Sequence, residues 1–157
     1  MRFASVLIAL LLAPARNTLY APPQDPSQAL RQMVQAYQTA WNTHDAAAVV
    51  AFYTEDADQV MQGGATTVGR EALTQWWRTR FAAMEPGRKI ALTVTAVRLV
   101  TPQVAIVNTI ATTGGQDAHG KELSGATDRG TWVVIQKDGH WLMAALRVGP
   151  AEEGAAR

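Results

Sequence analysis

Two aspartates stand close together in the first half of the chain, Asp56 and Asp58, and their carboxylates are candidates for acid–base chemistry. Side chains two residues apart in an extended turn share a face, so one of them could reach the mouth of a pocket as a base with a raised pKa. The simpler interpretation, which we favour, is that Asp56 caps the turn and Asp58 is solvated. Asp128, at the start of a later strand, leaves the same choice open.

Polar side chains also interrupt otherwise apolar strands in the second half of the chain: Asn108, Arg129, Thr131 and Arg147. Such residues on a half-buried sheet either face solvent or converge inside a pocket. An arginine at 147 could clamp a ligand carboxylate through two parallel N–H bonds. Alternatively, it forms a structural ion pair with Asp56 or Glu55.

Several kinds of site lack their sequence signature. The chain has no cysteine, which excludes thiolate ligands and thiol nucleophiles, and its three histidines are not spaced as metal ligands. There is no phosphate loop, dinucleotide fingerprint or nucleophile elbow. Basic runs interleaved with aromatic residues are also missing. We therefore expect no metal, no cofactor and no nucleic-acid partner.

Length and charge fit one globular domain. The chain has 157 residues, with 14 Lys and Arg against 13 Asp and Glu. A chain of this length buries roughly two-thirds of its unfolded surface, enough for a hydrophobic core without disulfides.

The first 21 residues differ in composition from the rest. Arg2 precedes an apolar run over residues 4–12 and then Pro14, the pattern of a secretory signal peptide, with cleavage after Ala15 or Ala21. The alternative is a misplaced start codon that adds meaningless leader residues. The run is too short to span a bilayer, so we expect a secreted or periplasmic protein with no membrane attachment after signal removal.

The remainder divides into a linker over 22–28, one domain over 29–149 and a disordered tail over 150–157. Apolar residues at helical spacing predict a first helix over 26–42, capped by Asp25. Asp45 can cap a second helix over 46–53, which ends in an acidic turn over 54–58. A third helix should follow Gly69, with a stripe of large apolar side chains.

From residue 89 the hydrophobic period changes to two, which predicts long antiparallel strands over 89–100, 104–111, 127–136 and 141–148. Gly63-Gly64 marks a shorter hairpin before the third helix. Both faces of the long strands carry apolar residues. One face must pack on the helices, and the other favours a homodimer through the sheet.

These elements, in this order, resemble the nuclear transport factor 2-like superfamily, and most closely its secreted SgcJ/EcaC group, near the SnoaL-like polyketide cyclases and ketosteroid isomerases. The resemblance spans about Ala29 to Val148. Its motifs are Tyr37-x3-Trp41-Asn42-x2-Asp45, Val49-x2-Phe52-Tyr53-x2-Asp56-Ala57, Gly69-Arg70-Glu71-Ala72-Leu73, Asp138-Gly139-His140-Trp141 and Ala144-Ala145-Leu146-Arg147-Val148. The resemblance implies an α+β fold, a cone-shaped barrel of a curved mixed, mostly antiparallel sheet wrapped around three N-terminal helices. It leaves the function open, because this scaffold hosts enzymes, ligand carriers and assembly modules.

Compared with the ketosteroid isomerases, Tyr37 stands where their oxyanion-hole tyrosine stands, and Tyr53 where a supporting tyrosine would be. A third supporting tyrosine would fall at Trp77. A phenol in an apolar cavity can stabilise an enolate oxygen, although Tyr37 could equally be a core tyrosine satisfied by Tyr53. The proton-shuttling acid of that mechanism falls on Met61, which cannot exchange a proton. Steroid isomerisation by this machinery is therefore disfavoured.

We accordingly predict a secreted, dimeric SgcJ/EcaC-like protein that binds a small, largely apolar ligand in the cone. This ligand could also carry a negative charge. The predicted lining is Tyr37, Trp41, Tyr53, Met61, Trp76, Trp77, Asn108, Thr131 and Arg147. The first alternative is a cyclase, dehydratase or isomerase with Tyr37 and Asp56 as catalytic residues. The second is a non-catalytic dimerisation module, as in the association domain of calmodulin-dependent kinase.

Overall fold

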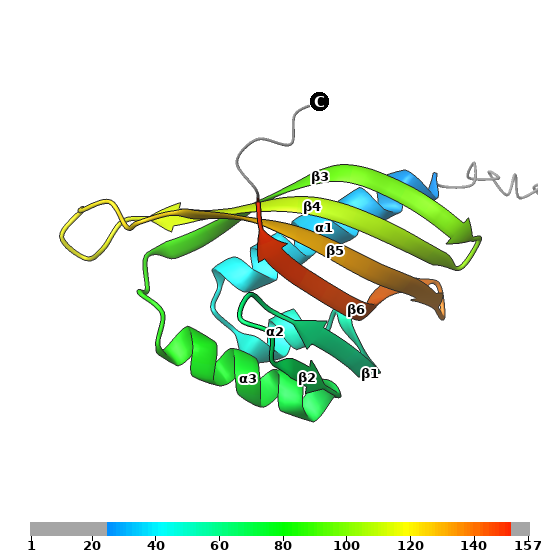
Figure 1. The fold of residues 1–157 in the computed structure, drawn as a ribbon, viewed down its shortest axis with the longest axis horizontal. Helices are drawn as coiled ribbons and strands as arrows, with labels where there is room; N and C mark the ends of the chain where they lie inside the picture. Colours follow the sequence, from blue (N-terminus) through cyan, green and yellow to red (C-terminus); the bar gives the residue numbers. More distant parts are fainter. Residues whose placement is uncertain (1–24, 152–157) are drawn as a thin grey trace, which may run out of the picture.

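A curved six-stranded sheet covers three helices in the computed structural model, which describes residues 25–151 (Figure 1). The helices are α1 (Pro26–Asn42), α2 (Ala46–Val50) and α3 (Arg70–Ala82). The strands are β1 (Tyr53–Val60), β2 (Thr66–Val68), β3 (Arg88–Thr101), β4 (Val104–Gly115), β5 (Ala126–Lys137) and β6 (His140–Pro150). The predicted α+β class is confirmed.

The strand order is β2-β1-β6-β5-β4-β3. Strands β3 to β6 form an antiparallel meander, whereas β1 pairs with β6 in parallel, so the sheet is mixed and mostly antiparallel as expected. The β5–β6 turn places Asp138 and Gly139 at positive φ, which suits the tight hairpin that the Asp-Gly pair predicts. The long meander curves over α1, while α3 lies below β1 and β2 (Figure 1).

Local sequence explains the beginnings of α1 and α2. The carboxylate of Asp25 accepts a hydrogen bond from the backbone N–H of Ser27, and that of Asp45 accepts from Ala47 and Ala48. The predicted apolar stripe of α1 is buried. Each cap therefore satisfies backbone donors that the first turn of a helix would otherwise leave free.

The second helix is shorter than expected. It ends at Val50, and Tyr53 begins strand β1, so the predicted acidic turn over 54–58 is part of a strand. The reason is tertiary: β1 pairs with β6 on one side and β2 on the other, and its backbone hydrogen bonds are available only in extended conformation.

Both ends of the predicted domain also shift. Residues 26–28, assigned to the linker, are the first turn of α1, and Pro150, assigned to the tail, ends β6. The predicted signal peptide over 1–21 and residues 152–157 of the predicted tail lie outside the described residues. Within residues 25–151, no helix is long and apolar enough to cross a membrane.

Side chains of α1 cover the free edge of the sheet. Strand β3 is an edge strand, and its exposed backbone groups are a site where another strand could pair. The Asn42 amide donates to the carbonyl of Ile90 at 3.1 Å and accepts from its N–H at 2.8 Å. The Gln38 carbonyl oxygen accepts from the N–H of Leu92 at 2.6 Å. The helix thus closes the cone on this side.

We expect Asn42→Ala to lower the free energy of unfolding by about 2 kcal/mol, because it leaves two partly buried backbone groups of Ile90 without partners. Urea unfolding followed by circular dichroism measures the change. Gln35→Ala, on the exposed side of the same helix, is the matched control and should change stability little. Equal stability of the two variants would contradict this role of Asn42.

Candidate functional site

A cavity of about 450 Å³ opens between the concave face of the sheet and helices α1 and α3. Its floor and walls carry five large aromatic side chains together with Leu146, Val148, Ile90 and Leu92. The aromatic residues are Tyr37, Trp41, Trp76, Trp77 and Trp132. This size and lining are typical of sites for small, largely apolar ligands.

Polar groups also line this cavity: Arg80, Glu85, Arg88, Ser124 and Asp128. Among the described residues, neither arginine forms an ion pair, and neither carboxylate does. Arg88 donates through Nη1 to the carbonyl of Ser124 at 2.9 Å, which ties the β4–β5 loop to the start of β3. The cavity therefore presents two cations and two carboxylates alongside its apolar floor.

The aromatic floor is held by ring contacts within α3 and between elements. The ring of Tyr37 from α1 meets that of Trp132 from β5 at a centroid distance of 5.0 Å and an interplanar angle of 68°. Trp77 of α3 packs on Phe81 at 5.1 Å, and Phe81 in turn meets Trp41 at 5.6 Å. These geometries suit the ring quadrupoles and lock α1, α3 and β5 around the cavity.

Behind the floor, two phenols and an amide form a buried row. The hydroxyls of Tyr37 and Tyr53 lie 3.5 Å apart, and the Tyr53 hydroxyl donates to Oε1 of Gln59 at 3.2 Å. Burial raises the pKa of Tyr53 to about 12, despite lowering by the Tyr37 hydroxyl and the Trp77 indole. Burial, and then the neighbouring Tyr53, raise the pKa of Tyr37 well above its usual value. Both phenols are therefore neutral at physiological pH.

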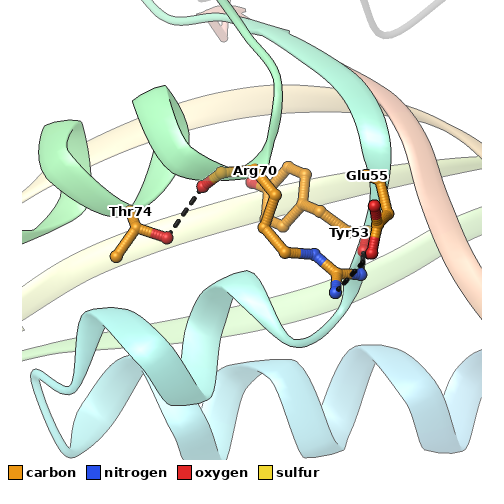
Figure 2. A network of polar contacts seen from close by, with 4 residues as sticks. All are labelled: Tyr53, Glu55, Arg70 and Thr74. Carbon is orange, nitrogen blue, oxygen red and sulfur yellow. Dashed lines mark hydrogen bonds and ion pairs between the residues drawn. The ribbon is translucent and has the colours of Figure 1, made fainter.

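Arg70 at the start of α3 fixes the backbone that carries Tyr53 (Figure 2). Its Nη2 donates to the carbonyl oxygen of Tyr53, and its Nη1 lies 3.6 Å from the carboxylate of Glu55. The hydroxyl of Thr74 donates to the Arg70 carbonyl one turn along the helix at 2.7 Å. The guanidinium thus joins α3 to β1 directly behind the tyrosine pair.

A glycine, Gly130, shapes the cavity wall formed by β4 and β5, because it has no side chain. Thr109 lies opposite Gly130 in the sheet, and both line the cavity. A Cβ at Gly130 would lie 2.5 Å from the hydroxyl oxygen of Thr109 and 2.9 Å from the indole nitrogen of Trp132. Glycine here therefore leaves room for the Thr109 hydroxyl and the Trp132 indole nitrogen beside the strand at the cavity wall.

We expect Gly130→Ala to lower stability by about 2 kcal/mol and to disturb this wall, because Thr109 and Trp132 must move. Thermal unfolding together with tryptophan fluorescence reports both effects. Gly149→Ala is the matched control, since Gly149 also lies in a strand and a Cβ there meets nothing within 4 Å. Identical behaviour of the two variants would contradict the proposed crowding.

The structure places the predicted lining residues in three groups. Tyr37, Trp41, Met61, Trp76 and Trp77 line the cavity. Tyr53 does not; it is fully buried behind Tyr37.

The third group lies away from the cavity. Asn108, Thr131 and Arg147 are exposed residues of β4, β5 and β6, and their sequence neighbours Thr109, Trp132 and Leu146 line the cavity instead. Since successive side chains of a strand point to opposite faces, these three belong to the outer face. Arg147 pairs with Asp58 at 2.5 Å, which is a structural ion pair with a different partner from those expected. Asp56 is exposed and does not line the cavity, so the structure does not bring it to Tyr37.

The sequence interpretation missed Thr109 and Trp132, which alternate with Asn108 and Thr131 on β4 and β5. It also missed the polar groups Arg80, Glu85 and Arg88. On β5, alternation places Gly130, Trp132 and Val134 on one face, but only the folded sheet shows that this face is the buried one. For the arginines no signal was available, since exposed basic residues near a helix end are common. Within residues 25–151, no cluster of three His, Asp or Glu side chains could hold a metal ion.

The family model for the SnoaL-like domain matches residues 34–144, which include the whole cavity floor except Leu146 and Val148. The chain belongs to the SnoaL-like domain family. This places it in the nuclear transport factor 2-like superfamily, as the sequence motifs indicated. Comparison with curated proteins gives no match.

Solved structures with this fold belong to proteins with different names. A putative calmodulin-dependent protein kinase II association domain from Xanthomonas campestris has a TM-score of 0.70 at 20% identity, covering 84% of this chain and 92% of its own. A putative scytalone dehydratase from Novosphingobium aromaticivorans has a TM-score of 0.71 at 15% identity, with coverages of 81% and 85%. A ketosteroid isomerase-like protein from Erwinia carotovora has a TM-score of 0.68 at 20% identity, with coverages of 82% and 98%. Identities this low establish the shared fold alone.

Proposed function

We propose that this SnoaL-like protein binds a small, largely apolar molecule in the cone cavity, with a polar or anionic group of the ligand close to Arg80 and Arg88. The observation that carries the proposal is the cavity of about 450 Å³, which has an aromatic floor and ionisable groups among its lining residues. The cations that could attract an anionic group are these two arginines, and the earlier candidate Arg147 lies on the outer face, paired with Asp58.

The lining argues for binding more strongly than for catalysis by the ketosteroid-isomerase route. Met61 lines the cavity where the proton-shuttling acid of those enzymes would fall, and a thioether neither gives nor takes a proton. The five aromatic side chains supply apolar area and stacking surfaces, which small ligands use for affinity.

A titration with 1-anilinonaphthalene-8-sulfonate tests the proposal, because this probe is both apolar and anionic. We expect saturable 1:1 binding with blue-shifted probe emission and quenching of tryptophan emission, since Trp41, Trp76, Trp77 and Trp132 line the cavity. Binding that does not saturate, or that leaves the tryptophan emission unchanged, would contradict a site in the cone.

A second candidate function, catalysis of proton transfer, is favoured by the placement of Asp128. This carboxylate lines the cavity, two residues before Gly130 and four before Trp132 on the same strand face, and replaces Asp56 as the candidate base. A base in the cavity would exchange the protons beside the carbonyl of a bound ketone. Deuterium incorporation into 1-indanone, followed by NMR, tests this candidate. Catalysis by Asp128 predicts that wild type exchanges these protons faster than buffer alone, and that Asp128→Asn loses this extra exchange.

We also propose a homodimer through the outer sheet face. Half-buried Ile106, Ile110 and Val133 on β4 and β5 support it, since they leave apolar surface on the side away from the helices. Sedimentation of wild type against Ile110→Lys tests the dimer. Export, together with membership of the SgcJ/EcaC group, is proposed from the sequence alone, and N-terminal sequencing of protein from its own host tests the cleavage.

A further inference from the structure

The buried row of Tyr37, Tyr53 and Gln59 connects the cavity to strand β1. Tyr37 lines the cavity, whereas Tyr53 and Gln59 have no exposed surface. The two links of the row are the 3.5 Å contact between the phenol oxygens and the 3.2 Å bond from Tyr53 to Gln59. The row therefore carries hydrogen bonds between the ligand cavity and a residue that no ligand can touch.

Counting protons along the row gives its direction. The carbonyl oxygen of Gln59 can only accept, so the single proton of Tyr53 lies on that bond. The Tyr53 oxygen must then accept from Tyr37, whose own proton points away from the cavity. In this arrangement Tyr37 offers a ligand only lone pairs. It also leaves Nε2 of Gln59 buried with no hydrogen-bond partner among residues 25–151.

Rotation of the Gln59 amide by half a turn reverses the row. The oxygen and the NH2 group of an amide are nearly equal in size, so they can exchange places without changing the packing. The amide nitrogen then donates to Tyr53, Tyr53 donates to Tyr37, and the Tyr37 proton becomes free for the cavity. The exchange gives the buried Nε2 a partner and leaves Oε1 without one, so each orientation satisfies one of the two amide atoms among the described residues.

We propose that Gln59 is a positioning residue that sets the direction of the tyrosine row, and that a ligand with a carbonyl oxygen selects the orientation in which Tyr37 donates to it. The inference rests on the proposed function and names its ligand class: compact apolar ketones and related acceptors. The long separation of the two phenol oxygens supports it, because a 3.5 Å bond holds the Tyr37 proton weakly. Burial also keeps both phenols protonated, as donors must be.

The test compares 1-indanone with indane, which has the same skeleton without the carbonyl. Their affinities are measured by calorimetry on the full chain, and the carbonyl stretch of bound 1-indanone is read by infrared spectroscopy. We expect wild type to bind the ketone roughly 5- to 10-fold more tightly, as one hydrogen bond allows. Tyr37→Phe should reduce this ratio to about one and shift the stretch to higher frequency.

Two substitutions at Gln59 separate its effect on the direction of the hydrogen bonds from its effect on side-chain packing. Gln59→Glu should keep the preference at low pH, where the carboxyl can donate, and lose it as the carboxyl ionises and can only accept. Wild type should show no such pH profile. Gln59→Met removes the acceptor for Tyr53 and should raise the ketone preference above that of wild type. An unchanged preference in this variant contradicts the role of Gln59 even where the glutamate variant fails to fold.

The outcomes distinguish the two proposals. If neither compound binds wild type, the proposed function fails and this inference fails with it. If both bind but the ketone preference is the same in wild type and in Gln59→Met, and does not change with pH in a folded Gln59→Glu, only the role of Gln59 is wrong. A fall in both affinities by equal factors in the Gln59 variants would indicate packing alone, and would likewise overturn the inference.

Discussion

Replacement of Ala111 by phenylalanine is expected to weaken binding of 1-anilinonaphthalene-8-sulfonate by on the order of 100-fold, or roughly 3 kcal/mol. Ala111 lies on β4 opposite Asp128, and its small side chain lines the cavity. A phenyl ring at this position would project into the space that the probe needs. Because the cavity is open there, the added ring has room, and stability should change little compared with overpacking of a filled core.

Thr112→Phe is the matched control for this substitution. Thr112 is the next residue of the same strand, is exposed, and does not line the cavity. The control adds a similar ring to the outer face and should bind the probe as wild type does. If Thr112→Phe loses as much affinity as Ala111→Phe, the probe binds on the outer face and the cone is not its site.

Alkaline pH is expected to remove about 3 kcal/mol of stability through Tyr53 alone. Its pKa is about 12 in the folded protein against an ordinary value of 10.0, and burial is the main cause. Because the unfolded chain releases this proton more easily, the contribution is fully present below pH 10 and is lost as pH rises through 12. Two pKa units correspond to roughly 3 kcal/mol. Tyr37 adds to the loss in the same direction.

Urea unfolding at several pH values between 8 and 12 measures this loss, with phenolate absorbance as a second signal. Tyr53→Phe keeps the ring and removes the titrating hydroxyl, so its stability should fall less steeply above pH 10. At neutral pH the variant should be less stable than wild type, because Oε1 of Gln59 loses its donor. Parallel curves for the two proteins would show that Tyr53 does not carry the effect.

Local sequence patterns account for most of the fold. The stripe of α1 and the caps at Asp25 and Asp45 are properties of short segments, so they can be recognised without knowing the partners of those segments. The same holds for the alternating strands and the Asp138-Gly139 hairpin. The end of α2 was misplaced because β1 becomes a strand only by pairing with β6, a partner about 90 residues later.

The helical part of the site was also accessible from sequence. On α1, the helical period predicts that Tyr37 and Trp41 share the buried face, and they do. On α3, Trp77 follows the same rule. A helix that packs on a sheet has one apolar face, so the inward direction of its residues follows from the sequence.

The strand part of the site was decided by tertiary structure. Both faces of β4, β5 and β6 carry apolar residues, so alternation shows which residues share a face but not which face is concave. The structure turns Thr109 and Trp132 inward, and their neighbours Asn108 and Thr131 outward. The partner of Arg147 was decided in the same way, since β1 and β6 meet only in the folded sheet.

Residue type and short-range periodicity were enough to predict the superfamily, the helices, the buried tyrosine and the methionine in place of an acid. The folded chain was needed to show which strand face is concave, that Asp128 lines the cavity and Asp56 does not, and that Gln59 ends the tyrosine row. The physical reason is that a cavity is a gap between elements, and its walls are set by curvature, register and pairing across long sequence distances.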